Sequence, residues 1–467
     1  MADQRQLHVL MFPWLAHGHI TPFLELAKSL QSHGLKISFL STPLNIERIR
    51  HQISELQPSP EIDLVQLPMP AVAGLPTGVE STSDLSKIGA LNLIPLLFKA
   101  LDLCEKPFET LLKLLSPDFV IHDMVQYWAP RVAAKLGIPA INFVVLTAAS
   151  MSFTAGHYRH RLQQILKAED LTVPPLGFPS SAVRRRLFEA RKTLFSYQNK
   201  QDGEGITFMD RRAIAVEESW AAACNTDLEL EGKFAKYFEA STGRPVFPVG
   251  ILMHDLPPRP VADPCLAWLD QQPARSVVFA SFGSECALTR HQVTALVLGL
   301  EESEIPFLCI LIGHDVAALP PEFEARTRGR GLVVTEWAPQ VHILGHPSTG
   351  ASLTHCGWTS ITEGLRFGVP FVALPMQYDQ GLNARLISEE FKVGEEVRRN
   401  EEDGSFTKED IARAVRVVMV EEEGNKIKSN VEEISRFLTK DDCQVHRTNM
   451  HDFVSALKQK ASKKQNI

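Results

Sequence analysis

Apolar and polar positions along the chain recur with the periods of strands and helices. Residues 7–13 form a short apolar run, which predicts a strand. From residue 19 to residue 33, apolar side chains follow at helical spacing, and Gly34 then ends the pattern. Residues 36–41 predict the next strand. A strand, a helix and a second strand in this order are typical of a βαβ unit.

The same alternation continues in both halves of the chain. It predicts strands at residues 119–122, 140–145, 276–282, 307–312, 332–335, 351–354 and 371–374, and helices at residues 289–303, 360–367 and 379–390. Residues 150–245 are more helical and less periodic, and they give no clear assignment. Alternating strands and helices imply parallel sheets with helices on both faces, so the predicted fold class is α/β.

A proline-rich stretch separates the two series of elements. The chain has 467 residues, whereas a single core stops growing at about 250–300 residues. Residues 254–264 hold four prolines and predict an extended linker. We therefore expect one domain over residues 1–250 and a second over residues 251–445.

Composition and charge exclude several classes of function. The chain is 44% hydrophobic and 22% charged, which is typical of a globular protein, and its net charge of −7 provides no general attraction for nucleic acid or anionic membranes. The cluster Arg184–Arg186 is a local exception, which we interpret as a solvated helix face rather than a phosphate site. Neither first strand is followed by GxGxxG, and GxxxxGK[ST] does not occur, which argues against nicotinamide dehydrogenases and P-loop NTPases.

The cysteines and the residues near the two ends of the sequence indicate the cellular compartment in which the protein is expected. The seven cysteines form no CxxC pair, so no structural zinc site is expected, and their odd number fits a reducing compartment. The apolar run near the N-terminus is too short for a secretory signal or a membrane span, and the last ten residues are polar. We expect a cytoplasmic monomer without membrane insertion.

The richest stretch for chemistry runs from residue 337 to residue 380. The strand at residues 351–354 is followed by a turn that contains His355 and Gly357, and such a strand-to-helix turn presents backbone N–H groups to phosphate. His355 adds a further donor. We expect Thr359 or Ser360 to cap the next helix, with Glu363 completing a capping box.

Three more polar or aromatic side chains follow strands of the same predicted sheet. Trp337 offers a flat face for a base, and Asp379 and Gln380 suit the hydroxyls of a sugar. Each has a simpler interpretation: Trp337 and Trp358 as core or rim aromatics, and the Asp–Gln pair as solvated surface. Their positions on three consecutive strand ends favour one shared site.

The first strand-to-helix loop carries a second group of candidates. His17 and His19 lie there without a recognisable third ligand, so a metal site is not expected. One histidine is predicted to act as a general base, because its pKa lies near neutrality. The base needs a carboxylate partner, and Asp123, at the end of the strand at residues 119–122, is the best candidate.

Residues 337–380 resemble the signature box of plant secondary-metabolite UDP-glycosyltransferases, from WAPQ through HCGW and the E–G pair to the final D–Q. The N-terminal βαβ unit, the turn at residues 281–284 and the overall length extend the resemblance over the whole chain. It implies the GT-B architecture of two facing Rossmann-like domains, with the acceptor in the first and the UDP-sugar in the second. Residues 446–467 would form a helix that crosses back to the N-terminal domain.

The resemblance also implies roles for individual residues of the second half. Trp337 would stack on uracil, Ala338 and Gln340 would contact the base and ribose, and Glu363 would accept from the ribose hydroxyls. The residues implied around the diphosphate are Ser284, His355 and Ser360, and those around the sugar are Trp358, Asp379 and Gln380.

Position 359 departs from the family pattern, which commonly has Asn there, so a donor contact of Thr359 stays open. A final Gln380 favours UDP-glucose, although UDP-galactose, UDP-xylose and UDP-rhamnose remain alternatives.

In the first half, the family motif G-H-x-x-P aligns with residues 18–22 and selects His19 as the base, which leaves His17 as a loop residue that could line the acceptor pocket. The motif around Asp123 supports it as partner, with His122 facing away. The implied reaction is an inverting transfer in which His19 deprotonates an acceptor hydroxyl while UDP leaves. Neither a metal nor another cofactor is expected.

The acceptor is less closely defined. Residues 74–84, the loop at residues 14–19 and Thr359 resemble family members that extend a sugar on a flavonoid or terpenoid glycoside. We therefore expect transfer of a hexose, with glucose favoured, to such a glycoside. The alternatives are transfer to a bare aglycone, a nucleotide-sugar epimerase, a non-catalytic UDP-sugar-binding protein and a nicotinamide oxidoreductase.

Overall fold

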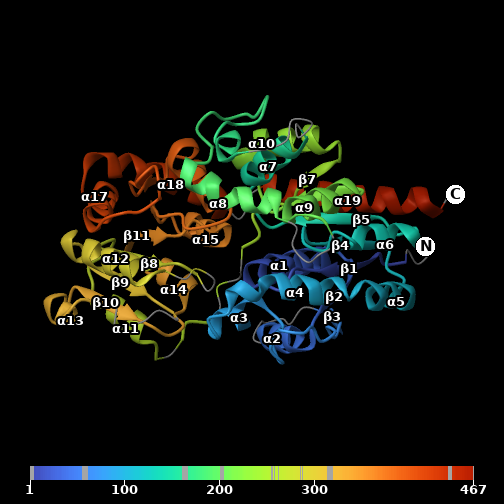
Figure 1. Ribbon diagram of the computed structural model, residues 1–467, viewed down its shortest axis with the longest axis horizontal. Coiled ribbons are helices and arrows are strands. Elements are labelled where there is room, and N and C mark those ends of the chain that lie inside the picture. The colour runs from blue at the N-terminus through green and yellow to red at the C-terminus, as the bar shows by residue number, and fades with distance from the viewer. Residues whose placement is uncertain are drawn as a thin grey trace.

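The computed structural model contains two parallel β-sheets with helices packed around them (Figure 1). It describes residues 5–54, 61–159, 167–199, 205–253, 256, 258–260, 262–283, 286, 288–312, 319–439 and 444–465. The predicted α/β class with two parallel sheets is confirmed, and the domain limits near residues 250 and 445 stay predictions.

The first sheet has seven strands in the order β3-β2-β1-β4-β5-β6-β7, and every neighbouring pair is parallel. Its strands are β1 (His8–Phe12), β2 (Lys36–Ser41), β3 (Ile62–Gln66), β4 (Phe119–His122), β5 (Ala140–Val144), β6 (Ala221–Cys224) and β7 (Val246–Pro248). The chain changes direction across the sheet between β1 and β4. In a parallel sheet, a ligand crevice opens at the carboxyl ends of the two strands that flank such a point.

The second sheet has six strands in the order β10-β9-β8-β11-β12-β13, again all parallel. Its strands are β8 (Val277–Ser281), β9 (Phe307–Ile310), β10 (Gly331–Val334), β11 (Thr349–Thr354), β12 (Phe371–Ala373) and β13 (Gly394–Glu396). In this sheet the chain changes direction between β8 and β11. Each sheet therefore offers one crevice at the carboxyl ends of its strands.

Helices cover both faces of each sheet. Those of the first half are α1 (His17–Ser32), α2 (Pro43–Ser54), α3 (Thr82–Lys87), α4 (Ile94–Asp102), α5 (Glu105–Leu115), α6 (Ala129–Lys135), α7 (Ala148–Arg159), α8 (Leu187–Gln198), α9 (Phe208–Glu217) and α10 (Leu228–Thr242), with short 3₁₀ turns η1 (Leu91–Leu93) and η2 (Ala168–Leu171). Those of the second half are α11 (Pro264–Leu269), α12 (Arg290–Glu302), α13 (Phe323–Arg326), α14 (Gln340–Leu344), α15 (Trp358–Arg366), α16 (Gln380–Arg385), α17 (Lys408–Met419), α18 (Glu422–Thr439) and α19 (Gln444–Gln465), with a π-helical turn η4 (Leu386–Glu390). No described helix combines the length and the apolar character needed to cross a membrane.

The strand β1 shows why its short apolar run folds as a central strand. Leu10 and Phe12 belong to the core on one face of the sheet, whereas Val9 and Met11 belong to the core on the other face. Successive side chains of a strand point to opposite faces, so a strand covered on both sides is apolar throughout.

The last helix, α19, packs on the first sheet although it follows the second in sequence. Its residues Phe453 and Leu457 are fully buried in the same core as Val9. The side chain of Asn449 donates to the Asp227 carboxylate at the start of α10 (3.0 Å). Figure 1 shows the red helix running alongside α9 and β7. The chain therefore ties its C-terminal end to its N-terminal half.

The predicted elements differ from the structure in three respects. The pattern missed β3, β6, β7 and β13, which are short or lack a continuous β-branched run. The helix expected at residues 360–367 begins at Trp358, and the one expected at residues 379–390 divides into α16 and η4. The interpretation of Arg184–Arg186 as a solvated helix face is wrong: the three residues precede α8, and Arg185 is buried.

The buried His122 makes the stability of the fold depend on pH. Its ring bonds to the Asp123 carbonyl (2.8 Å) and the Ser219 hydroxyl (2.9 Å) at the end of β4. Burial lowers the pKa of His122 from 6.5 to about 4. Between these values the unfolded chain binds a proton that the folded chain does not, so acidification from pH 7 to pH 5 costs the fold about 2 kcal/mol at this site.

Replacement of His122 by Gln removes this titration and is expected to reduce the loss of thermal stability between pH 7 and pH 5. The measurement is the melting temperature of wild type and variant at both pH values. His291→Gln, at an exposed position on α12, serves as the matched control. If both variants lose as much stability as wild type, His122 does not titrate as proposed.

Candidate active site

A cleft of about 1370 Å³ brings together residues of both sheets. The residues predicted from the sequence that line it are His19, Trp337, Ala338, Gln340, His355, Trp358, Thr359, Ser360, Glu363, Asp379 and Gln380. Asp123 lies behind His19 and does not reach the surface of the cleft. Ser284 lies outside the described residues. Candidates that are up to about 360 positions apart in sequence therefore meet in one place.

The crevice of the first sheet holds a histidine and a carboxylate in contact. His19 lies in the first turn of α1, and Asp123 directly follows β4, which pairs with β1. The Asp123 carboxylate lies 2.8 Å from His19 Nδ1 and also accepts from the backbone N–H groups of Trp14 (3.0 Å) and Met124 (2.7 Å). The two backbone groups donate to the carboxylate, so it acts as an acceptor here and favours the tautomer of His19 that carries its proton on Nδ1. Nε2 is then the ring nitrogen suited to take up a proton at the cleft.

His17, the first residue of α1, contacts the second half of the molecule. Its ring meets the ring of Trp337 edge-on, with centroids 6.1 Å apart and an interplanar angle of 89°. Trp337 follows β10 and is 70% exposed, so a flat aromatic face is presented to the cleft. The side chains of His17 and Trp337 thus bridge the two walls of the cleft.

The crevice of the second sheet contains His355, which sits between two glycine turns. A Cβ at Gly357 would lie 2.7 Å from His355 Nε2, and one at Gly283 would lie 3.1 Å from Cε1. Burial lowers the pKa of His355 to about 4, while the Ser281 backbone acts weakly in the opposite direction. The ring is therefore neutral at pH 7. Its buried Nδ1 finds no hydrogen-bond partner in the described part of the chain, so a polar ligand could use it.

The helix α15 begins two residues earlier than the sequence suggested, and this overturns the predicted cap. Gly357 is the N-cap residue and makes no side-chain bond, so neither Thr359 nor Ser360 caps the helix. The expected capping box with Glu363 is absent as well. The first backbone N–H groups of α15 are thus left for an anion at the positive end of the helix dipole.

Glu363 instead belongs to a polar group centred on Gln340. The amide nitrogen of Gln340 donates to Glu363 Oε2 (2.7 Å) and lies 3.3 Å from the Ser360 hydroxyl, while its oxygen accepts from Ser281 (3.1 Å). These bonds fix the Glu363 carboxylate in the wall of the cleft, which Ala338 and Trp337 also line. A carboxylate in this position can accept two adjacent hydroxyl groups of a ligand.

Trp358 has a role that the sequence did not suggest. Its side chain is 4% exposed, and its indole N–H donates to the carbonyl of Asn225 in the first half (2.9 Å). The indole nitrogen therefore joins the two halves, and the rest of the residue lines the cleft.

The turn that carries Asp379 and Gln380 is held by several hydrogen bonds. The side-chain oxygen of Gln380 accepts from the N–H groups of Met376 (3.0 Å) and Gln377 (2.9 Å). Asn383 donates to Asp379 Oδ2 (2.8 Å) and accepts from Thr147 of the first half at the same distance. Sequence reasoning missed Asn383, although its position four residues after Asp379 on a helix was a usable signal.

The described residues contain no group of three or more His, Cys, Asp or Glu side chains arranged to hold a metal ion.

Two protein-family models together match nearly the whole chain. The model of the glycosyltransferase N-terminal domain matches residues 5–235, and the model described as UDP-glucoronosyl and UDP-glucosyl transferase matches residues 233–444. The two matches meet in α10, before the proline-rich stretch.

Individual proteins are similar over more than nine tenths of their length. The chain is 38% identical to the anthocyanidin-3-O-glucoside rhamnosyltransferase of Petunia hybrida, covering 94% of this chain and 93% of that protein. It is 37% identical to the cyanidin 3-O-galactoside 2''-O-xylosyltransferase of Actinidia chinensis var. chinensis, covering 91% and 92%. The structure of Phytolacca americana UGT2 with UDP-2fluoro-glucose and pterostilbene superposes with a TM-score of 0.75 at 27% identity, covering 98% and 99%.

Proposed function

Because this chain belongs to the UDP-glycosyltransferase family and is an enzyme of that family, we propose that it transfers a sugar from a UDP-sugar to a hydroxyl group of a plant glycoside. The observation that carries the proposal is the cleft, in which the His19–Asp123 pair of the first sheet faces the Trp337, His355 and Asp379 positions of the second. A base on one wall and a nucleotide-sugar site on the other are what such a transfer requires.

In the proposed reaction, His19 Nε2 removes the proton of an acceptor hydroxyl while the oxygen attacks the anomeric carbon. The bond between that carbon and the UDP oxygen breaks on the opposite face, so the configuration inverts. Asp123 stabilises the imidazolium that forms. The negative charge on the departing diphosphate is met by the backbone N–H groups of α15 and by an N–H of His355.

The donor is proposed to lie along the second wall. Uracil stacks on Trp337 beside Ala338, and the ribose hydroxyls bond to Glu363, which Gln340 orients. The diphosphate lies near His355 and the start of α15. The residues proposed to complete the site are Ser284, Thr359 and Ser360 at the diphosphate and Trp358, Asp379 and Gln380 at the sugar.

We propose glucose as the transferred sugar, on the strength of Gln380. The two relatives carry rhamnose and xylose in their names, so both sugars belong in the test. A glycoside acceptor is favoured by residues 74–84 and by the same relatives, whose names specify a glucoside and a galactoside as acceptors. Transfer to an aglycone is the alternative.

The test is an assay of UDP release with UDP-glucose, UDP-galactose, UDP-xylose and UDP-rhamnose against flavonoid and terpenoid aglycones and their glucosides, with products identified by mass spectrometry. The proposal predicts acceptor-dependent release of UDP and a product one sugar heavier than the glycoside. Products from aglycones alone would favour the alternative acceptor. Binding of UDP-sugars without turnover would indicate a binding protein. Conversion of the UDP-sugar in the absence of an acceptor would indicate an epimerase.

We also propose that the reaction needs no metal ion, because helix N–H groups and His355 can oppose the diphosphate charge. Prior removal of divalent ions with EDTA is then expected to change the transfer rate by less than about twofold. Added Mg²⁺ or Mn²⁺ serves as the comparison. A large drop in the transfer rate after EDTA treatment, with the rate restored by either ion, would contradict this part of the proposal.

A cytoplasmic location is proposed on the basis of the cysteines. All six cysteines in the described part of the chain are buried and unpaired, which suits a reducing compartment.

A further inference from the structure

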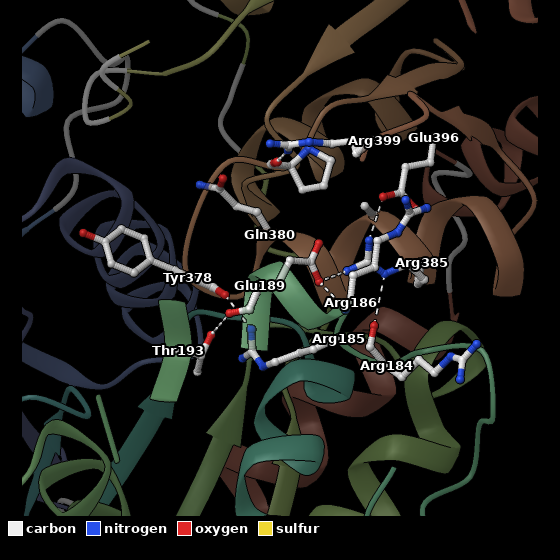
Figure 2. Close-up of polar contacts among 12 residues, drawn as sticks. Arg184, Arg185, Arg186, Glu189, Thr193, Tyr378, Gln380, Arg385, Glu396 and Arg399 are labelled. Carbon is white, nitrogen blue, oxygen red and sulfur yellow. Dashed lines mark hydrogen bonds and ion pairs between the residues drawn. The ribbon is translucent and has the colours of Figure 1, made fainter. Parts of the chain in front are cut away.

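The arginine cluster Arg184–Arg186 lies at the junction of the two halves rather than on a solvated surface. It immediately precedes α8, which Figure 1 shows between the two sheets. Figure 2 shows the cluster and Glu189 facing Tyr378, Arg385 and Glu396 of the second half. The segment of residues 184–189 therefore contacts the helix α16 that begins with Gln380.

Arg185 holds the turn that leads into this helix. Its Nη1 donates to the backbone carbonyl of Tyr378 (2.8 Å), and its side chain is 4% exposed. Tyr378 has φ of +55°, a left-handed conformation that is unfavourable for a residue other than glycine and persists only where its surroundings impose it. Burial lowers the pKa of Arg185, and the negative charge of Asp379 is among those that oppose this shift.

The same segment holds the other end of α16. Arg385, the last residue of the helix, pairs with Glu189 and donates from Nε to the carbonyl of Arg184 (3.1 Å). Its Nη1 also donates to Glu396, the last residue of β13 (2.7 Å). In the first turn of the helix, a Cβ at Gly381 would lie 2.4 Å from the Glu189 carboxylate, so the helix backbone packs directly on this segment.

Asp379 and Gln380 lie between these two anchors. The structure shows no hydrogen bond from the side chain of Asp379 or Gln380 to residues 184–189. Both residues directly follow Tyr378, whose backbone carbonyl accepts from Arg185. The direction in which they enter the cleft depends on the backbone of the turn. A displacement of the turn would move both groups relative to a bound sugar while leaving Trp337 and Glu363, on other elements, in place.

We propose that Arg185, supplied by the N-terminal half, is a positioning residue for the donor sugar: it fixes the Tyr378 turn so that Asp379 and Gln380 meet the sugar hydroxyls. This inference rests on the proposed function, in which that turn binds the sugar of a UDP-sugar. Recognition of the sugar, but not of UDP, then depends on Arg185.

The test compares Arg185→Met with Arg191→Met, both on full-length protein. Arg191 also crosses to the second half, where it bonds to Glu402 (2.7 Å and 3.2 Å), but both side chains are exposed and lie away from the turn. For Arg185→Met we expect kcat/KM for the preferred UDP-sugar to fall about 10- to 100-fold, with the Kd for UDP changed by less than about twofold. Arg191→Met should keep both values within about twofold of wild type.

Calorimetric titration with UDP and with the UDP-sugar separates this inference from the proposed function. If wild type transfers no sugar, the proposed function fails, whereas a UDP-sugar affinity that Arg185→Met lowers without affecting UDP still supports the role of Arg185. If Arg185→Met retains sugar recognition, or loses UDP and UDP-sugar affinity equally, the inference is wrong. Arg185→Lys keeps the positive charge and a donor nitrogen, so its kcat/KM should lie between those of wild type and Arg185→Met. A kcat/KM no higher than that of Arg185→Met would also contradict the inference.

Discussion

Replacing His19 by Ala is expected to lower the rate of glycosyl transfer by at least about 1000-fold, since a positioned general base contributes up to about 10⁴ to a rate. His19 is the residue whose Nδ1 is tied to a fully buried carboxylate and whose ring lines the cleft. Because Trp337 and Glu363 lie in the second half of the chain, after β10 and in α15, the affinity for UDP should change little. The measurements are kcat for transfer and the Kd for UDP.

His17→Ala is the matched control for this prediction. His17 lies in the same first turn of α1 and lines the same cleft, but its ring contacts Trp337. Its loss should affect mainly the KM for the donor, by about tenfold or less. Transfer by His19→Ala near the wild-type rate would refute the assignment of the base.

Asp123→Asn is expected to lower kcat by about 100- to 10,000-fold while changing KM only slightly. Asp123 accepts from His19 and from the N–H groups of Trp14 and Met124. An amide has a single acceptor oxygen and no charge, so it cannot satisfy these donors equally, and it does not stabilise an imidazolium. His19 would then adopt the wrong tautomer for part of the time.

Asp118→Asn provides the control because Asp118 precedes the same strand, β4, at the end remote from the cleft. It bonds to Arg5 and to the backbone of His8, so its replacement tests a general effect on the sheet. The expected change in kcat is less than about twofold. If Asp123→Asn also changes kcat by less than about threefold, Asp123 has only a structural role.

The sequence was sufficient to locate elements whose pattern is local. Residues 36–41 and 119–122 form β2 and β4 with the predicted bounds, because each is a short segment with apolar side chains that is bounded by turn residues. His19 and Asp123 could be paired in advance since both follow strands of one parallel sheet, whose carboxyl ends share an edge.

The features that were missed depend on contacts between distant parts of the chain. The strand β6 has the sequence Ala-Ala-Ala-Cys and becomes a strand only because β5 and β7 pair with it. Arg185 was interpreted as solvated because a charge cluster gives no sign of a partner 193 positions away. The cap of α15 was misplaced because Gly357 starts the helix through its backbone, without the side-chain bond that a sequence pattern can indicate.

The most direct test of the central claim is the structure, determined by nuclear magnetic resonance, of the product that wild-type protein makes from a UDP-sugar of known anomeric configuration. In-line attack by an acceptor oxygen activated by His19 predicts a glycoside linked through an acceptor hydroxyl, with the anomeric configuration inverted relative to the donor. A product with retained configuration, or release of free sugar without a glycoside, would contradict it.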